Sequence, residues 1–433
     1  MKCWINMKKT GLKTYMVLFA LISLLVACQK EEADIFPNSP AERLNKAISD
    51  YHTLLTDAPN GWEMDYFANT VSPGYTLLVK FNKSGNALLA SRSELTANKA
   101  YEKDSCLFDI IGDNGPVLTF NTFSKIMHVF SNPENPDGYG LEGDYEFVIV
   151  KASADTVWMK GKKYGAEVLL HKLPSNVQWK QFADNRYDFT SLLFSSKAPA
   201  LTLKIDKTSY FFSAGYTRVF TVKRASANPN PFDVPFIVTQ DGIRFYEEIE
   251  IDGIKLKTFR LNEAKNGLVS VESPAYTLSG VDDLATFFTG DATTVWNFIP
   301  SEFNSSLNQQ YQNIIQSVKS LYAADDVALS LKFNAIRRIF VLSVVYTQGT
   351  NKTEGLLDLN INAVNKDLLT VSYKGTGDTK GLQFYNEVTD LDDFLSAVSS
   401  SFSLSTSAKI NPEEIKFTKT TNQQVYFSIE PGS

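Results

Sequence analysis

The residue types that carry out most metal and covalent chemistry are scarce in this chain. Its 433 residues include only three cysteines and three histidines, which leaves little room for a disulfide framework or for a zinc site built from these side chains. The sequence contains no His-Glu-x-x-His pair, no Cys-x-x-Cys, no Gly-x-Ser-x-Gly and no glycine-rich phosphate loop. It therefore predicts no cofactor and no metal site, and it offers no catalytic residue.

Basic residues are also fewer than acidic ones. There are 42 lysines and arginines against 48 aspartates and glutamates, a formal net charge of −6. Removal of residues 1–27 would take away four lysines and no acid, which brings the net charge to about −10. Such a chain repels a phosphate backbone, so nucleic acid is excluded as a partner. Hydrophobic residues at 43% and charged residues at 21% predict a folded protein rather than a disordered one.

Only one long apolar run occurs, and it lies near the N-terminus. Lysines at positions 8, 9 and 13 precede 13 apolar residues that run from Tyr15 to Ala27. These are the proportions of a signal peptide, and the run has about two-thirds of the length that a membrane-spanning helix needs. Cys28 follows it directly. Two interpretations of this run involve no lipid. One is a cleaved secretory signal beside a chance cysteine, and the other is a retained membrane helix.

The residues Leu25-Val26-Ala27-Cys28 resemble the lipobox of bacterial lipoproteins. The resemblance implies that Cys28 carries lipid on its thiol and becomes the mature N-terminus. Lipid chains contribute about 0.8 kcal/mol per buried methylene, so they hold a protein at a membrane without a spanning segment. The acidic stretch from Gln29 to Asp34 resembles the surface-export signal of Bacteroidota lipoproteins. We therefore expect a lipid-anchored protein of the outer membrane, exposed at the cell surface, with the periplasmic face as the alternative. Met1 and Met7 are both possible starts.

Helix and strand signals divide the chain into a leader and folded regions. The expected regions are a signal peptide (1–27), a lipidated tether (28–40), a domain of one helix plus antiparallel strands (41–200), a β-rich continuation of the N-terminal region (201–290) and a C-terminal domain of helix plus strands (291–433). Ser39, Pro40 and Glu42 form the start signals of a helix over 41–55, whose apolar residues recur at spacings of three and four. Further helices are expected over 176–195, 304–322 and 391–399.

From Trp62 onward, short apolar runs are separated by clusters of glycine, asparagine and proline, which is the pattern of strands joined by turns. The strands expected in the first region are Trp62–Phe67, Tyr75–Phe81, Ala87–Ser91, Val117–Asn121, Ile126–Phe130, Tyr145–Val150, Thr156–Lys160 and Glu167–His171. The pattern predicts an α+β, predominantly antiparallel β fold. Barrel-like or curled meander sheets would each be accompanied by one or two helices.

Two pairs of segments echo one another along the chain. Leu78–Asn82 resembles Leu329–Asn334, and Gly242–Glu248 resembles Gly381–Glu387. The two pairs are separated by different offsets, 252 and 139 residues, so no single repeat period fits. A duplication with a long insertion and a chance similarity between amphipathic strands both stay open.

Aromatic residues are abundant in the chain, which has 30 phenylalanines and 19 tyrosines. Most should serve in cores and cross-strand pairs. Tyr139 differs because turn residues on both sides should keep it at the surface, so it is the candidate to stack on a sugar ring. Cys106 has no histidine nearby to activate it and is expected to be a buried, inert thiol. The histidines His52, His128 and His171 are expected to have structural or surface roles, the last two on strands.

Four segments together resemble a Bacteroidota lipoprotein family known only as a domain of unknown function, the 4302 type. They are Ala41–Phe67, Gly115–Phe120, Gly143–Ile149 and Lys160–Lys163, and the resemblance is clearest over residues 28–200. Lipoproteins of this kind resemble accessory components of outer-membrane nutrient-uptake systems. The family brings no established catalytic residues, so the resemblance carries over none except the lipidated Cys28.

Three functions are open at this point. The anchor and the resemblance favour a cell-envelope lipoprotein with a non-catalytic binding or scaffolding role, accessory to a glycan or peptide uptake system. Its partners would be the membrane, a glycan or peptide, and an outer-membrane transporter. A glycosidase or peptidase of the same system is the rival, because a glycosidase needs only two carboxylates about 5–10 Å apart. A structural partner would instead show a broad exposed apolar patch on the last third of the chain.

Overall fold

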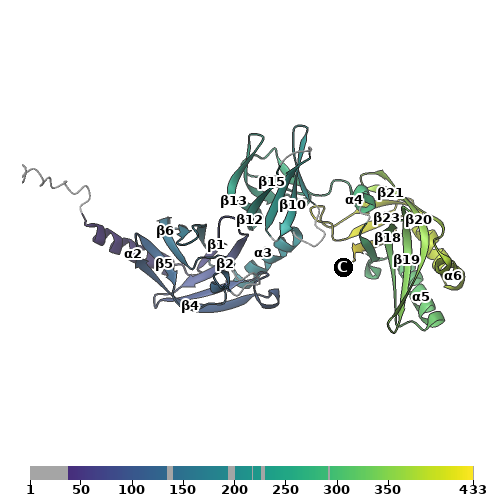
Figure 1. Cartoon of the computed structure of the whole chain (residues 1–433), viewed down its shortest axis with the longest axis horizontal. Helices are drawn as coiled ribbons and strands as arrows, with labels where there is room; N and C mark the ends of the chain where they lie inside the picture. The colour runs from purple at the N-terminus through teal and green to yellow at the C-terminus, as the bar shows by residue number, and fades with distance from the viewer. Residues whose placement is uncertain are drawn as a thin grey trace, which may run out of the picture.

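The computed structural model describes residues 38–133, 140–193, 200–216, 218–225, 230–290 and 293–432. Its strands form three closed antiparallel barrels of eight strands each, which follow one another along the chain. Within each barrel, strands adjacent in sequence are adjacent in space, so each is an up-and-down meander. Figure 1 shows the three barrels in a row from the purple to the yellow end of the chain. The predicted α+β, predominantly antiparallel fold is confirmed.

The first barrel follows one N-terminal helix, α2 (Pro40–Thr56). The predicted capping box is present: Glu42 N donates to Ser39 Oγ at 3.2 Å, and Ser39 N donates to Glu42 Oε2 at 2.9 Å. Leu55 in the last turn is buried in the barrel core, and Trp62 Nε1 donates to its carbonyl at 3.0 Å. The barrel strands are β1 (Trp62–Phe67), β2 (Gly74–Phe81), β3 (Asn86–Ser91), β4 (Glu102–Gly112), β5 (Pro116–Phe120), β6 (Glu146–Ala152), β7 (Thr156–Gly161) and β8 (Glu167–Lys172).

One predicted strand of this barrel is wrong. Residues Ile126–Phe130 form a turn that ends in the 3-10 helix η2 (His128–Phe130). The Ser124 side chain accepts from Ile126 N at 3.2 Å, and its carbonyl accepts from His128 N at 2.8 Å. A short apolar run fits a strand and a buried turn equally well, and here the serine hydrogen bonds decide for the turn.

The second barrel is joined to the first by helix α3 (Trp179–Leu193). Ala183 on α3 packs against Leu78 and Ala90 on the outer face of the first barrel, and Ile237 packs with Phe67 between the two barrels. Residues on both faces of β2 are therefore buried. The strands are β9 (Leu201–Ile205), β10 (Thr208–Tyr216), β11 (Val219–Arg224), β12 (Phe232–Val238), β13 (Gly242–Ile251), β14 (Ile254–Leu261), β15 (Gly267–Ser270) and β16 (Thr277–Ser279).

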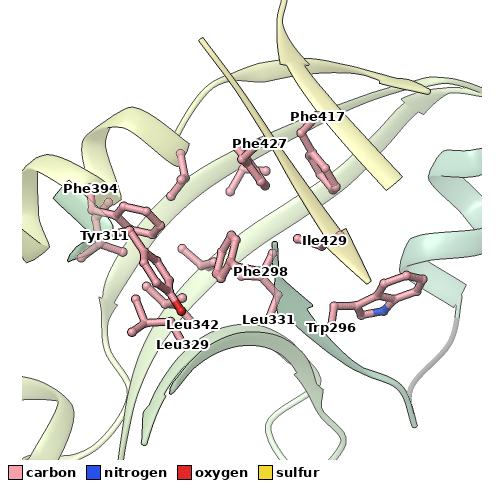
Figure 2. Close-up of a cluster of buried hydrophobic side chains, with 14 of the residues drawn as sticks. Trp296, Phe298, Tyr311, Leu329, Leu331, Leu342, Phe394, Phe417, Phe427 and Ile429 are labelled. Atoms are coloured by element: carbon pink, nitrogen blue, oxygen red, sulfur yellow. The ribbon is translucent and has the colours of Figure 1, made fainter. Parts of the chain in front are cut away.

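The third barrel carries most of the helices. They are α4 (Leu284–Gly290), α5 (Ser305–Tyr322), α6 (Thr379–Glu387) and α7 (Leu391–Val398). Its strands are β17 (Val295–Phe298), β18 (Asp326–Asn334), β19 (Ile339–Gln348), β20 (Asn351–Asn365), β21 (Leu368–Thr376), β22 (Ser401–Ser405), β23 (Ile415–Lys419) and β24 (Tyr426–Pro431). Figure 2 shows its core, in which Phe298 of β17 lies among Tyr311 of α5, Phe394 of α7 and Phe427 of β24.

The second and third barrels meet through one loop, residues 406–414 between β22 and β23. Ala408 and Ile410 of this loop are buried in the core cluster of the second barrel. Val281 N donates to Lys409 O at 2.7 Å, and Ile410 N donates to Lys265 O at 3.2 Å. The third barrel thus supplies part of the core of the second.

The two sequence echoes have different outcomes. Leu78–Asn82 lies mainly on β2 and Leu329–Asn334 on β18, and each is the second strand of its barrel. Gly242–Glu248 lies on strand β13, whereas Gly381–Glu387 lies in helix α6. The second echo is therefore a chance similarity. None of the helices in the described part of the chain is both long and apolar enough to span a membrane.

Candidate functional site

Both residues singled out from the sequence, Cys28 and Tyr139, lie outside the residues that the structure describes. The described chain stops at Pro133 and resumes at Gly140. Residues immediately beyond this gap line a hollow of about 300 Å³ on the first barrel. Its lining comes from the segment around η2, from the chain leading into β6 and from the turn between β7 and β8: Ser131, Glu142, Gly143, Asp144, Tyr145, Glu146, Lys163 and Tyr164.

Asp144 holds the two walls of this hollow together. Its side chain is buried, Oδ1 accepts from Lys163 N at 2.9 Å, and Oδ2 accepts from Tyr164 N at 2.8 Å. Its carbonyl accepts from the buried Tyr66 hydroxyl at 3.0 Å. Charge-assisted bonds to two consecutive backbone N–H groups fix the β7–β8 turn against the entry to β6. Asp144 therefore shapes the hollow, and both of its carboxylate oxygens accept hydrogen bonds for this purpose.

Gly143 is required for this close approach. A Cβ at this position would overlap the Tyr66 hydroxyl and would lie 2.5 Å from Phe130 Cβ. The absence of a side chain lets Gly143 N donate to Phe130 O at 2.9 Å, which brings η2 against the start of β6.

Tyr145 lines the hollow and is the end of a row of three rings in contact, Phe123, His128 and Tyr145, which we call the aromatic ledge. The His128 ring stacks on Tyr145 with centroids 5.0 Å apart and lies 5.6 Å from Phe123. Phe123 is 72% exposed and Tyr145 is 41% exposed. The ledge therefore presents aromatic surface to solvent beside polar side chains.

His128 is held as a neutral donor within the ledge. Its Nδ1 accepts from Ser124 N at 3.1 Å, so the proton of the neutral ring resides on Nε2. Burial lowers the pKa of His128 below its usual value, which keeps the ring uncharged at neutral pH. The prediction that His128 lies on a strand is wrong, because it begins η2.

The rim of the hollow is charged. Lys162 Nζ lies 2.9 Å from Asp113 and 3.0 Å from Glu146, and hydrogen bonds to these carboxylates raise the pKa of Lys162. Lys163 Nζ donates to the Tyr164 hydroxyl at 2.9 Å and lies 4.6 Å from the centre of that ring. The hollow therefore presents hydroxyl, carboxylate and ammonium groups around aromatic faces.

Two carboxylates of this hollow have partners within the chain. Each carboxylate oxygen of Asp144 accepts from a backbone N–H group, and Glu146 accepts from Lys162. The described ranges contain no group of three His, Cys, Asp or Glu side chains placed to hold a metal ion. Burial raises the pKa of the Cys106 thiol to about 11, so this cysteine is the buried, inert thiol that was expected.

The other two histidines have structural partners. The His52 ring stacks on Phe108 of the first barrel, with centroids 5.8 Å apart. His171 lies on β8, as expected, with Nε2 at 3.3 Å from the buried Asp65 carboxylate.

A model of the family described as "Domain of unknown function (DUF4302)" matches residues 32–263, more than half of the chain. The chain belongs to this family. The DUF4302 match covers the first barrel and the second as far as β14. Two of the segments that carry the resemblance in sequence, Gly143–Ile149 and Lys160–Lys163, form facing walls of the hollow.

Comparison with other known proteins adds little to the DUF4302 assignment. No curated protein matches the chain. Among solved structures, a DNA polymerase sliding clamp from Pseudomonas aeruginosa is 11% identical, with 90% of this chain and 98% of that chain covered and a TM-score of 0.15. The DNA polymerase III subunit beta from the same organism is 10% identical over the same shares, with a TM-score of 0.14. Scores this low carry no argument about fold or function.

Several residues of the hollow and the ledge were not singled out from the sequence, whereas Tyr139 stays a prediction because it lies outside the described residues. Tyr145 and Tyr164 were not singled out, although both stand in segments quoted for the DUF4302 resemblance or directly beside one. Tyr164 has the same signal as Tyr139, a tyrosine next to charged and glycine residues in a turn. His128 was assigned to a strand, and Phe123 lies between two predicted strands, where no signal marked it.

Proposed function

We propose that this DUF4302 protein is a non-catalytic glycan-binding lipoprotein of the cell envelope, and that the hollow with the aromatic ledge is its binding site. The observation that carries the proposal is the exposed aromatic surface of the ledge, whose Tyr145 lines a polar hollow of about 300 Å³. A sugar ring has an apolar face of C–H groups and an edge of hydroxyl groups. Aromatic faces suit the first and the polar rim suits the second.

The closed barrels favour a glycan over a peptide. Extended peptides are commonly captured by adding a strand to an open sheet edge. Each of the three sheets formed by the described strands closes on itself, so none of them offers such an edge. Recognition at the hollow must then come from side chains, which suits a ligand whose hydroxyl groups project in several directions.

The proposal also includes a location, which depends on the expected lipid anchor at Cys28. Lipid on Cys28 would hold the barrels at the outer membrane, on the cell surface, where a bound glycan can pass to a neighbouring transporter of an uptake system. Acids at 29–34 next to the lipidated cysteine support the outward-facing side. Two membrane signals or several acyl chains give stable attachment without any spanning helix.

A glycan array followed by affinity measurement tests the proposal. Purified residues 29–433 should bind a subset of glycans, and Tyr145→Ala should weaken that binding about tenfold, as the loss of one stacking face with its apolar contact is worth roughly 1.4 kcal/mol. The matched control is Tyr385→Ala in the third barrel, because Tyr385 is also half-exposed and stacked on a tyrosine. It should bind like the wild type.

Three results would contradict this function. Equal loss of binding in both variants, or no binding to any glycan, would remove the hollow as a glycan site. Release of new reducing ends from a bound glycan would show that the protein is a hydrolase instead.

A further inference from the structure

A second, much smaller cavity lies at the junction of the first and second barrels. Its volume is about 20 Å³, roughly the space of one water molecule. Three arginines from three separate elements line it. Arg92 follows β3, Arg186 lies on α3, and Arg218 precedes β11 in the second barrel.

Each guanidinium group is bound to a carboxylate through its terminal nitrogens. The pairs are Arg92 Nη1 with Asp184 at 2.8 Å, Arg186 Nη2 with Glu63 at 2.9 Å, and Arg218 with both oxygens of Glu94 at 3.1 and 2.5 Å. The positive charge is therefore balanced, and the groups are held in fixed orientations.

The Nε–H groups of two of these arginines have no acceptor. Arg186 Nε and Arg218 Nε are buried and make no hydrogen bond in the described chain. The side chains of Arg186 and Arg218 are only 10% and 5% exposed. A buried donor left without a partner is costly, so native structures rarely contain one, and here two belong to residues lining one cavity.

The surroundings hold these donors rigidly. Arg218 has a φ of +58°, a left-handed conformation that non-glycine residues seldom adopt. Its guanidinium lies 4.3 Å from the centre of the Tyr75 ring, and that of Arg186 lies 4.4 Å from the Phe182 ring. Ring contacts and a fixed backbone therefore restrict the orientations that the two guanidinium groups can adopt.

We propose that this cavity binds a single monatomic anion such as chloride, which accepts the Nε–H groups of Arg186 and Arg218. An anion only accepts hydrogen bonds, which matches a site that offers two unpaired donors. The volume of about 20 Å³ suits an occupant of about the size of a water molecule, as a monatomic anion is. Because Arg218 comes from the second barrel and Arg186 packs on the first, the bound anion ties the two barrels together.

The first test is chloride-dependent stability of the full mature chain. With ionic strength held constant by gluconate, raising chloride from 1 to 200 mM should increase the thermal unfolding midpoint by a few degrees. Arg186→Lys keeps the charge but lacks the Nε–H, and its midpoint should not respond to chloride. The matched control is Arg244→Lys, because Arg244 binds Asp65 at 2.6 Å at the same junction without lining the cavity. This variant should respond like the wild type.

The second test locates the ion directly and does not depend on a variant that folds. Crystals of the wild-type chain soaked in bromide should show an anomalous peak between Arg186 and Arg218. Water density in the cavity without such a peak would overturn the proposal. A bromide peak in a protein whose stability ignores chloride would mark binding at crystal concentration only, and would overturn it equally.

Discussion

Asp65 gathers charged groups from both of the first two barrels around one buried carboxylate. Arg244 of β13 donates to it at 2.6 Å, and His171 Nε2 lies 3.3 Å away. Glu63 lies two residues along β1 and binds Arg186 of α3. This network joins the first barrel, the second barrel and α3, so protonation of a single ring should affect how firmly they hold together.

His171 should make the stability of the chain depend on pH. The hydrogen bond with Asp65 raises the pKa of His171, and Asp65, Glu63 and Arg244 are the charged groups that face it. The stabilisation is complete below the unfolded-state pKa of about 6.5 and is lost as pH rises through the higher folded-state pKa. We expect the free energy of unfolding by urea to fall between about pH 6 and pH 8 in the wild type, and to fall less in His171→Gln.

His52→Gln is the control, because His52 contacts an aromatic ring rather than a carboxylate. His128 acts in the opposite direction and in a lower window, since its pKa is lowered in the folded chain. Wild-type and His171→Gln curves that run parallel from pH 6 to pH 8 would contradict this role for His171.

At the scale of elements, the sequence predicted those helices and strands whose ends are set by neighbouring residues. The capping box of Ser39 and Glu42 placed α2 to within a residue at each end, and β1 was predicted with its observed bounds. Ile126–Phe130 was wrong because serine hydrogen bonds, not hydrophobic pattern, decide that segment. The hollow itself could not be predicted from the sequence, because its walls at 142–146 and 163–164 meet only when β6 pairs with β7.

The loop over 406–414 is the clearest case of a contact that no local pattern reveals. It belongs to the third barrel, yet it fills the core of the second, whose strands lie more than 100 residues earlier in the chain. Ile410 is 1% exposed there. Nothing in the sequence around Ile410 distinguishes it from a residue that packs within its own barrel.

Truncating Ile410 should therefore weaken the second barrel. We expect Ile410→Ala to cost about 2–4 kcal/mol, the usual range for removing a buried isoleucine side chain. Hydrogen exchange should show lost protection in β9–β16 ahead of β1–β8. Ile336→Ala is the control, because Ile336 is 96% exposed in the third barrel and its truncation should change nothing. Lost protection confined to the third barrel would contradict the role of this loop.

At the scale of the whole molecule, the three barrels lie in a row, and the described chain enters the first barrel through α2 (Figure 1). The proposed glycan site lies on that first barrel, within the DUF4302 match, and the proposed anion site lies where the first barrel meets the second. In sequence, the proposed glycan site thus lies on the barrel that directly follows the proposed lipid attachment at Cys28.

The proposed lipid anchor on Cys28 can be tested separately. In cells, Cys28→Ala should prevent lipid attachment and move the protein from the membrane fraction to the soluble fraction, because the proposed attachment comes from lipid chains on this thiol. Cell fractionation followed by immunoblotting measures this directly. Ser105→Ala beside the inert Cys106 is a neutral control. A Cys28→Ala protein that stays in the membrane fraction would contradict lipid anchoring through this residue.

The most direct measurement of the central claim is a crystal structure of residues 29–433 with a glycan selected on the array. The account predicts a sugar ring that lies against Tyr145, with its hydroxyl groups in the hollow bounded by Glu142 and Lys163. A glycan bound on another surface, with the aromatic ledge bare, would contradict it.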